Sequence, residues 1–228
     1  GFSLFEAGDI WIADISDPRK PVVTKFPNVG KQPYDGLGGG NGRYYIAGLY
    51  GEDGLAMLDL WQAKPKVQRI LNGYAHDEKA FPVYKMPHLR GWSISDGKAF
   101  FPAIGHSKVL VAETAHWKQQ ASIGVAGQPV FVMAAPDARQ VWVNFAFPDN
   151  GKVQVIDVPT MKVVHSMEPC KGVLHFEFAP RSEEVWLSCR DDNRIQVYDT
   201  STFKLKAEFA ADSPSGIFFT SRATRIGM

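Results

Sequence analysis

The sequence predicts an all-β protein built as a β-propeller, and three observations support this fold class. Residues 172–205 alternate apolar and polar side chains in short runs broken by Pro, Asp, Asn and Ser, as in a meander of antiparallel strands. The same unit occurs one repeat earlier, since Trp142 lies 44 positions before Trp186 and Asp157 lies 42 positions before Asp199. A period in the forties with four strands per repeat is typical of a propeller blade.

The apolar runs place the strands of each repeat in order along the chain. The predicted strands lie at residues 10–14, 22–26, 30–35, 43–47, 55–60, 109–113, 173–179, 185–189 and 195–198. The glycine-rich stretch 38–42 is interpreted as a hairpin reversal, because no helix follows it to make a phosphate-binding loop.

An acidic residue ends the third strand of every repeat. These residues are Asp14, Asp59, Glu113, Asp157 and Asp199. Counted from an aromatic residue of the second strand (Tyr44, Phe100, Trp142 and Trp186 in turn), the acid follows after 15, 13, 15 and 13 positions. Because side chains alternate between the two faces of a strand, a change of two residues keeps every side chain on its face. The spacing therefore predicts hairpins that differ in length by two residues.

Five repeats of about 45 residues fill the chain, and each end of the chain falls within a repeat. Residues 72–86 are expected to form a charged insertion, and residues 217–220 to open a further innermost strand. A closed propeller joins its two termini within one blade, so we expect residues 1–228 to be one partial propeller domain with an open edge. An open edge favours association, for example as a homodimer. Further blades and any signal segment or membrane anchor are expected to precede Gly1.

Charge and cysteine content narrow the functional classes. With 25 basic and 24 acidic side chains, the chain shows no general surface for a polyanion, so nucleic acid is not an expected partner. Cys170 and Cys189 can oppose each other across a hairpin, but the sequence analysis favours two half-buried thiols over a disulfide. No GxSxG, HExxH or CxxC motif is present, and no metal site is predicted.

The candidate site lies where the first strands of successive blades meet the central axis. The repeat register directs Lys31 and five candidate side chains toward one space: Tyr34, Lys85, His88, Arg90 and His175. An imidazole suits proton transfer or iron ligation near neutral pH, so His88 and His175 are the candidate catalytic residues. Lysine and arginine suit the carboxylates of a cofactor. Together with the tyrosine and the two histidines, they make all five side chains candidate cofactor-binding residues. The main alternative for each histidine is a purely structural role.

Several stretches resemble the heme d1-binding propeller family, to which cytochrome cd1 nitrite reductase belongs. The resemblance is carried by PVYKMPHLRGW (82–92), GQPVFVMAAPDARQVWVNFAFPDN (127–150), VLHFEFAPRSEEVWLSCRD (173–191) and PSGIFFTSRATRIGM (214–228). It implies an eight-bladed propeller of which this chain is the C-terminal part, about five blades. It also implies that heme d1 or its precursor, an iron tetrapyrrole, binds on the axis of a periplasmic protein. His88 resembles one of two distal-pocket histidines of the nitrite reductase, whereas the other falls near Ala134, which argues against nitrite reduction.

Three functions follow from these observations as alternatives. The first is a late step of heme d1 biosynthesis, with the heme d1 precursor and other nitrite reductase maturation proteins as partners. The second is the related oxidoreductase activity of a dihydro-heme d1 dehydrogenase. The third is a propeller that serves only as a scaffold for protein interactions, because a fold does not dictate a function.

Overall fold

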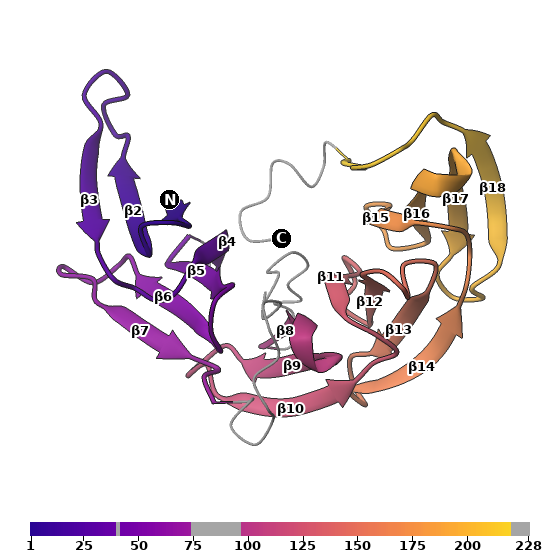
Figure 1. Cartoon of the computed structure of the whole chain (residues 1–228), viewed down its shortest axis with the longest axis horizontal. Helices are drawn as coiled ribbons and strands as arrows, with labels where there is room; N and C mark the ends of the chain where they lie inside the picture. Colours follow the sequence, from indigo (N-terminus) through magenta and orange to yellow (C-terminus); the bar gives the residue numbers. More distant parts are fainter. Residues whose placement is uncertain (40–41, 74–96, 220–228) are drawn as a thin grey trace.

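A computed structural model describes residues 1–39, 42–73 and 97–219, and these form five antiparallel sheets arranged in an arc (Figure 1). The strands are β1 (Phe2–Leu4), β2 (Asp9–Asp14), β3 (Val22–Phe26), β4 (Pro33–Gly39), β5 (Tyr44–Leu49), β6 (Leu55–Asp59), β7 (Val67–Ile70), β8 (Lys98–Ala103), β9 (Lys108–Glu113), β10 (Gln119–Gly124), β11 (Pro129–Ala134), β12 (Gln140–Phe145), β13 (Val153–Asp157), β14 (Lys162–Met167), β15 (Val173–Phe178), β16 (Glu184–Cys189), β17 (Arg194–Asp199) and β18 (Leu205–Ala210). Two short 3-10 helices, η1 (Ile104–His106) and η2 (Arg190–Asp192), are the helical segments of the described residues.

Each sheet is a meander in which consecutive strands pair, as the sequence predicts. The sheets are β1-β2-β3, β4-β5-β6-β7, β8-β9-β10, β11-β12-β13-β14 and β15-β16-β17-β18. Strands β4, β11 and β15 lie on the concave side of the arc, and β3, β7, β10, β14 and β18 form its outer rim (Figure 1). This radial arrangement confirms the predicted all-β propeller class.

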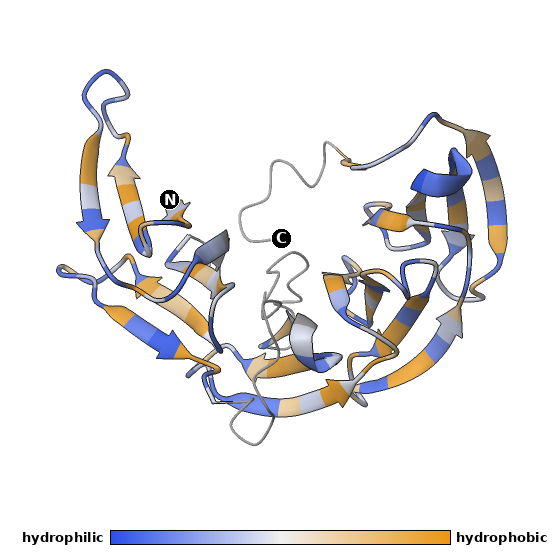
Figure 2. Ribbon diagram, viewed as in Figure 1, coloured by the Kyte–Doolittle hydropathy of each residue, from blue (hydrophilic) through white to orange (hydrophobic). Residues whose placement is uncertain are grey.

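The core lies between neighbouring sheets. Trp142 of β12 is fully buried, and its ring meets the edge of Phe178 of the next sheet at 6.1 Å between centroids. Residues of neighbouring sheets form one buried cluster, in which Trp142 and Val155 pack with Phe176 and Leu187. Hydrophobic and hydrophilic residues alternate along many of the strands (Figure 2). Burial of an aromatic side chain of this size is among the larger stabilising contributions in a core. Stacking of blade on blade therefore holds the arc together.

The recurring acid at the end of each third strand caps the turn that follows it. Asp199 accepts hydrogen bonds from the backbone N–H groups of Ser201 and Thr202 and from both hydroxyls, with the Ser201 hydroxyl at 2.7 Å. Asp157 likewise accepts from the backbone N–H and hydroxyl of Thr160. Such local hydrogen bonds to a side chain satisfy backbone N–H groups of the turn that have no partner in a neighbouring strand. The repeat thus marks a turn motif and not a ligand site.

We expect the Asp199 turn to make stability depend on pH in the acid range. Hydrogen bonds from Ser201 and Thr202 hold the pKa of Asp199 well below its usual range. A depressed pKa in the folded state stabilises the protein above the unfolded pKa, and this contribution is lost as pH falls through the folded value. The free energy of unfolding should therefore be higher for wild type than for Asp199→Ala near neutral pH, with a difference that shrinks as the pH drops below about 4. Urea titrations at several pH values measure this, and parallel pH curves for the two proteins would contradict it.

The strand register corrects one part of the predicted repeat. Tyr44 pairs directly with Asp59, as Gln140 pairs with Asp157. The residue equivalent to Trp142 is therefore Ile46, two positions after Tyr44. In this repeat the aromatic residue, Tyr44, lies two positions earlier in the second strand than Trp142 does in its strand, and on the same face. A count of residues in the sequence cannot distinguish this shift from a longer hairpin. A longer loop is present between β12 and β13, at residues 146–152.

Two further expectations are wrong. Cys170 and Cys189 form a disulfide, with 5.7 Å between their Cα atoms, where the sequence analysis favours free thiols. The bridge joins the segment before β15 to the last residue of β16 and so fastens the start of the inner strand. Residues 217–219 form no strand, although a further innermost strand was expected at 217–220. Residue 220 and most of the expected insertion, from residue 74 on, lie outside the described residues. Among the residues that the structure describes, no helix is long and apolar enough to cross a membrane.

Candidate functional site

The inner strand of three blades departs from regular pairing at the same place, just after it begins. The register shifts between Pro33 and Gly36 in β4, between Pro129 and Val132 in β11, and between Val173 and His175 in β15. A bulge adds a residue to one strand and redirects the side chains beside it. By this register Tyr34, Val130 and Leu174 occupy equivalent positions at the concave side of the arc.

In two of these blades a polar side chain of the second strand accepts a hydrogen bond from the backbone of the bulge. The Asn144 Oδ1 atom accepts a hydrogen bond from the backbone N–H of Phe131 at 2.8 Å. At the equivalent position of the next blade, the Ser188 hydroxyl accepts from the backbone N–H of His175 at 2.9 Å. Phe131 and His175 are therefore equivalent residues, and their rings meet edge to face at 5.1 Å.

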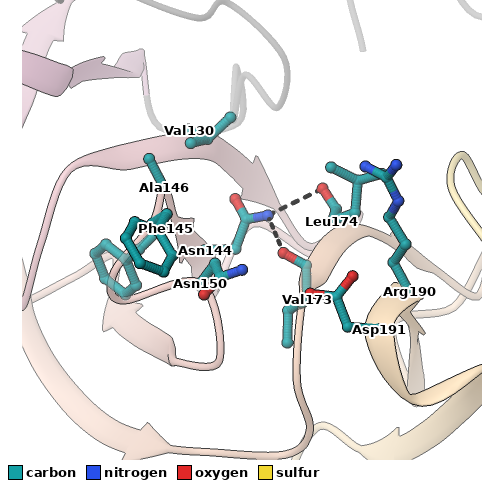
Figure 3. A pocket seen from close by; sticks show the side chains of 11 residues that line it. Val130, Asn144, Phe145, Ala146, Asn150, Val173, Leu174, Arg190 and Asp191 are labelled. Atoms are coloured by element: carbon teal, nitrogen blue, oxygen red, sulfur yellow. Dashed lines mark hydrogen bonds between the residues drawn. The ribbon is translucent and has the colours of Figure 1, made fainter.

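Asn144 also joins two blades. Its Nδ2 donates to the carbonyl oxygens of Val173 and Leu174, both at 3.0 Å, across the boundary to β15 (Figure 3). The side chain is only 1% exposed, so these bonds form away from water. Buried hydrogen bonds of this kind fix geometry because an unpaired partner is costly. The sheets β11–β14 and β15–β18 are the fourth and fifth blades along the chain. Asn144 thus sets where the inner strands of blades four and five lie relative to each other.

His175 is buried and packed between aromatic rings. It is 3% exposed, and the ring centroid of Phe218 lies 5.2 Å from that of His175. The His175 Nδ1 atom accepts a hydrogen bond from the backbone N–H of Ile217 at 3.1 Å. In a neutral imidazole whose Nδ1 is an acceptor, the proton sits on Nε2. This arrangement suits His175 to donate a proton or hydrogen bond through Nε2 and does not suit it to ligate a metal through that atom.

Tyr34 lies on the other arm of the arc, in a separate aromatic group. Its ring centroid is 6.0 Å from that of Phe5 and 6.1 Å from that of Tyr50, and its side chain is partly exposed. β4 and β15 stand on opposite sides of the concave face (Figure 1). Tyr34 and His175 are therefore not in contact, and any ligand that meets both must span the concave face.

The predicted residues Lys85, His88 and Arg90 lie outside the described residues, so their place in the site stays a prediction. Phe131 and Asn144 organise the surroundings of His175 and were not among the residues predicted from the sequence. The signal that could find Asn144 is its position two residues after Trp142, where the neighbouring blade also has a polar residue, Ser188. Within residues 1–39, 42–73 and 97–219, no group of three or more histidine, cysteine or acidic side chains is arranged to hold a metal ion.

A cleft of about 200 Å³ opens beside this region, between blades four and five (Figure 3). One wall is formed by Val130 and by the loop that follows β12, and the other by the start of β15 and by η2. The lining residues are Val130, Asn144, Phe145, Ala146, Phe147, Asn150, Gly172, Val173, Leu174, Arg190 and Asp191. Gly172 has a φ of +66°, and a Cβ there would lie 2.5 Å from the Asp191 carboxylate, so glycine keeps η2 close to the inner strand.

Comparison with known proteins assigns this propeller to a family. Residues 2–223 match the family described as the cytochrome D1 heme domain. The chain belongs to this family. Its sequence is 54% identical over 227 residues to Protein NirF of Pseudomonas aeruginosa and 52% identical to Protein NirF of Stutzerimonas stutzeri, with 100% of the chain covered in each case. The chain spans 58% of the length of each of these relatives.

Two solved structures superpose on most of the chain. The dihydro-heme d1 dehydrogenase NirN in complex with DHE matches with a TM-score of 0.73 and 18% identity, covering 94% of this chain and 45% of NirN. Kuenenia stuttgartiensis hydrazine synthase matches with a TM-score of 0.65 and 13% identity, covering 81% of this chain and 50% of that chain. At these identities the likeness concerns the fold. The match to the cytochrome D1 heme domain and the identity to the two NirF proteins confirm the family expected from the sequence.

Proposed function

We propose that the protein binds a heme d1-type tetrapyrrole on the propeller axis and takes part in a late step of heme d1 biosynthesis. The observation that carries this proposal is the match to the cytochrome D1 heme domain over residues 2–223, together with 54% identity to Protein NirF. The aromatic and histidine side chains at the concave ends of the inner strands fit such a ligand, because a flat macrocycle favours packing against rings.

The described residues have separate roles in this proposal. When bound, a heme d1-type macrocycle supplies a flat conjugated surface, an iron centre and ionised peripheral carboxylates. Phe131 and Phe218 keep the His175 ring in place, and we expect His175 to donate to the ligand through Nε2. On the opposite arm, Tyr34 supplies a phenol for a peripheral group, and Lys85 and Arg90 are predicted to pair with carboxylates. His88 is predicted to act beside His175 in proton transfer.

We extend the proposal to the cellular setting. A periplasmic location fits the Cys170–Cys189 disulfide, since such bonds persist in oxidising compartments. In that compartment the partners would be the heme d1 precursor and other nitrite reductase maturation proteins. Homodimer formation and a membrane anchor remain parts of the proposal that size measurements and membrane fractionation of the full-length protein test directly.

Titration of the protein with heme d1, followed through its visible absorption bands, tests the function. We expect a saturable band shift, and we expect His175→Phe to weaken binding by about fivefold to tenfold through loss of one hydrogen-bond donor. His165→Phe is the matched control, because His165 stacks on Phe203 at the outer rim, with 4.2 Å between ring centroids.

Three outcomes would count against parts of the proposal. A wild-type protein that leaves the bands of heme d1 unshifted would contradict tetrapyrrole binding. A shift that survives His88→Ala combined with His175→Ala would remove both histidines from the site. Oxidation of dihydro-heme d1 by the protein in the presence of an electron acceptor would instead favour the dehydrogenase activity.

A further inference from the structure

Two polar side chains line the cleft between blades four and five and form no hydrogen bond or ion pair within the described part of the chain. They are the Arg190 guanidinium and the Asn150 carboxamide. Both backbones are nevertheless held, because the Arg190 N–H donates to Gly172 O at 3.0 Å and Asn150 O accepts from the Val173 N–H at 2.8 Å. The backbone of both residues is therefore hydrogen-bonded, and their side chains present N–H donors that have no partner in the described chain.

Two other basic side chains near the cleft form ion pairs, whereas the Arg190 guanidinium forms none with the described residues. Lys152 pairs with Asp149 at 2.8 Å, and Arg194 pairs with Asp192 at 3.1 Å. Arg190 follows Cys189, whose disulfide fixes the end of β16, and Figure 3 shows its side chain rising beside Leu174 on the wall opposite Val130. A guanidinium presents its donors in a planar fork that matches the two oxygens of a carboxylate.

The size of the cleft limits what can enter it. Pockets that enclose a whole small molecule are usually about 300–1,000 Å³. A cleft of about 200 Å³ is too small for a tetrapyrrole ring, but it can take a short carboxylate-bearing side chain of a ring that lies outside it. Val130 and Leu174 are shared between the cleft and the concave end of the inner strands, so the cleft adjoins the proposed ring position.

We propose that this cleft binds a peripheral carboxylate of the tetrapyrrole, with the Arg190 guanidinium and the Asn150 carboxamide as donors. The assignment rests on the proposed function and deepens it, because it names the chemical group by which the macrocycle is oriented. Phe147, 81% exposed at the rim, gives the methylene groups next to that carboxylate an apolar contact.

Asp191 also lines the cleft, and its carboxylate opposes the bound anion. Like charges in one site disfavour each other, so Asp191 lowers the affinity for a carboxylate and restricts the cleft to a group held by both donors. Replacing Asp191 with asparagine removes this repulsion while it keeps the size of the side chain. Removing the charge of Arg190 and removing the charge of Asp191, both in η2, should therefore change the affinity for the same ligand in opposite directions.

The test uses iron(III) coproporphyrin III, which has four carboxylates, and its tetramethyl ester, which has none. We expect Arg190→Gln to raise the Kd of the acid by about tenfold, Arg190→Lys to raise it less, and Asp191→Asn to lower it. The Kd of the ester should be the same for all three variants and wild type. Arg181→Gln is the matched control, because Arg181 is exposed in the turn at the far end of the same blade.

The outcomes separate this assignment from the proposed function. If wild type binds both probes and Arg190→Gln leaves both Kd values unchanged, the carboxylate assignment is overturned and tetrapyrrole binding stands. If Arg190→Gln weakens the acid and the ester equally, the residue supports the fold of the cleft and the assignment is also overturned. If wild type binds neither probe and does not bind heme d1, both proposals are overturned.

Discussion

Asn144→Ala is expected to lower the free energy of unfolding by about 3 kcal/mol, although the change removes only a small side chain. The carboxamide accepts from Phe131 and donates to the carbonyl oxygens of Val173 and Leu174, and it is almost completely buried. Alanine removes the side-chain partner of one backbone donor and of two backbone acceptors in the core. Each unsatisfied buried group costs about 1–3 kcal/mol, partly offset where water enters from the cleft.

Urea denaturation of Asn144→Ala and wild type measures this difference, with Asn144→Asp and Ser188→Ala as comparisons. Aspartate keeps the acceptor for Phe131 but turns the two donor bonds into repulsion between oxygens, so it should be at least as destabilising as alanine. Ser188 has the equivalent position and bonds the N–H and carbonyl groups of His175 within one blade, so its loss should cost less. Equal stability of Asn144→Ala and wild type would show that the blade junction does not depend on this residue.

The architecture of the protein was predictable because it repeats. The period, the four-stranded unit and the acid that ends each third strand are all set by side-chain alternation and turn chemistry, which act over a few residues. Asp199 and its hydroxyl partners at Ser201 and Thr202 lie within three positions of each other. Local signals of this kind are readable without knowledge of the rest of the fold.

The arrangement of the site was less predictable because it depends on contacts between blades. Tyr34 and His175 hold nearby places in the repeat, but they stand on opposite arms of the arc and belong to different aromatic groups. The bulges in β4, β11 and β15 shift side chains by one position, and the sequence pattern does not mark them. The cleft with Arg190 arises where the loop after β12 meets η2, which are about 40 residues apart in the chain.

The disulfide was missed for a similar reason. The sequence places Cys170 just before β15 and Cys189 at the end of β16, and pairing requires that their Cα atoms approach within about 7 Å. That approach depends on the chain turning at Gly172, whose positive φ brings the segment before β15 back toward the end of β16. A residue count of 19 does not reveal this turn.

Removal of the disulfide is the second large effect that we expect. Cys170→Ser combined with Cys189→Ser should lower the free energy of unfolding by about 3 kcal/mol, since a bridge that closes a loop of this length restricts the unfolded chain by that amount. In the folded state the bridge also holds the segment before β15 against the residue that precedes Arg190. We therefore expect the double variant to bind a carboxylated tetrapyrrole more weakly even at temperatures where it remains folded.

Two measurements separate the stability effect from the effect on the cleft. Urea denaturation of wild type with and without dithiothreitol should reproduce the loss seen for the double variant, whose own stability should not respond to the reductant. Titration with iron(III) coproporphyrin III under native conditions should show a weaker affinity for the double variant, whereas affinity for the tetramethyl ester should change little. The double variant could instead be less stable and still bind both probes as tightly as wild type. The bridge would then stabilise the propeller without positioning Arg190, and the backbone hydrogen bonds of η2 to Gly172 and Lys171 would suffice to hold the cleft open.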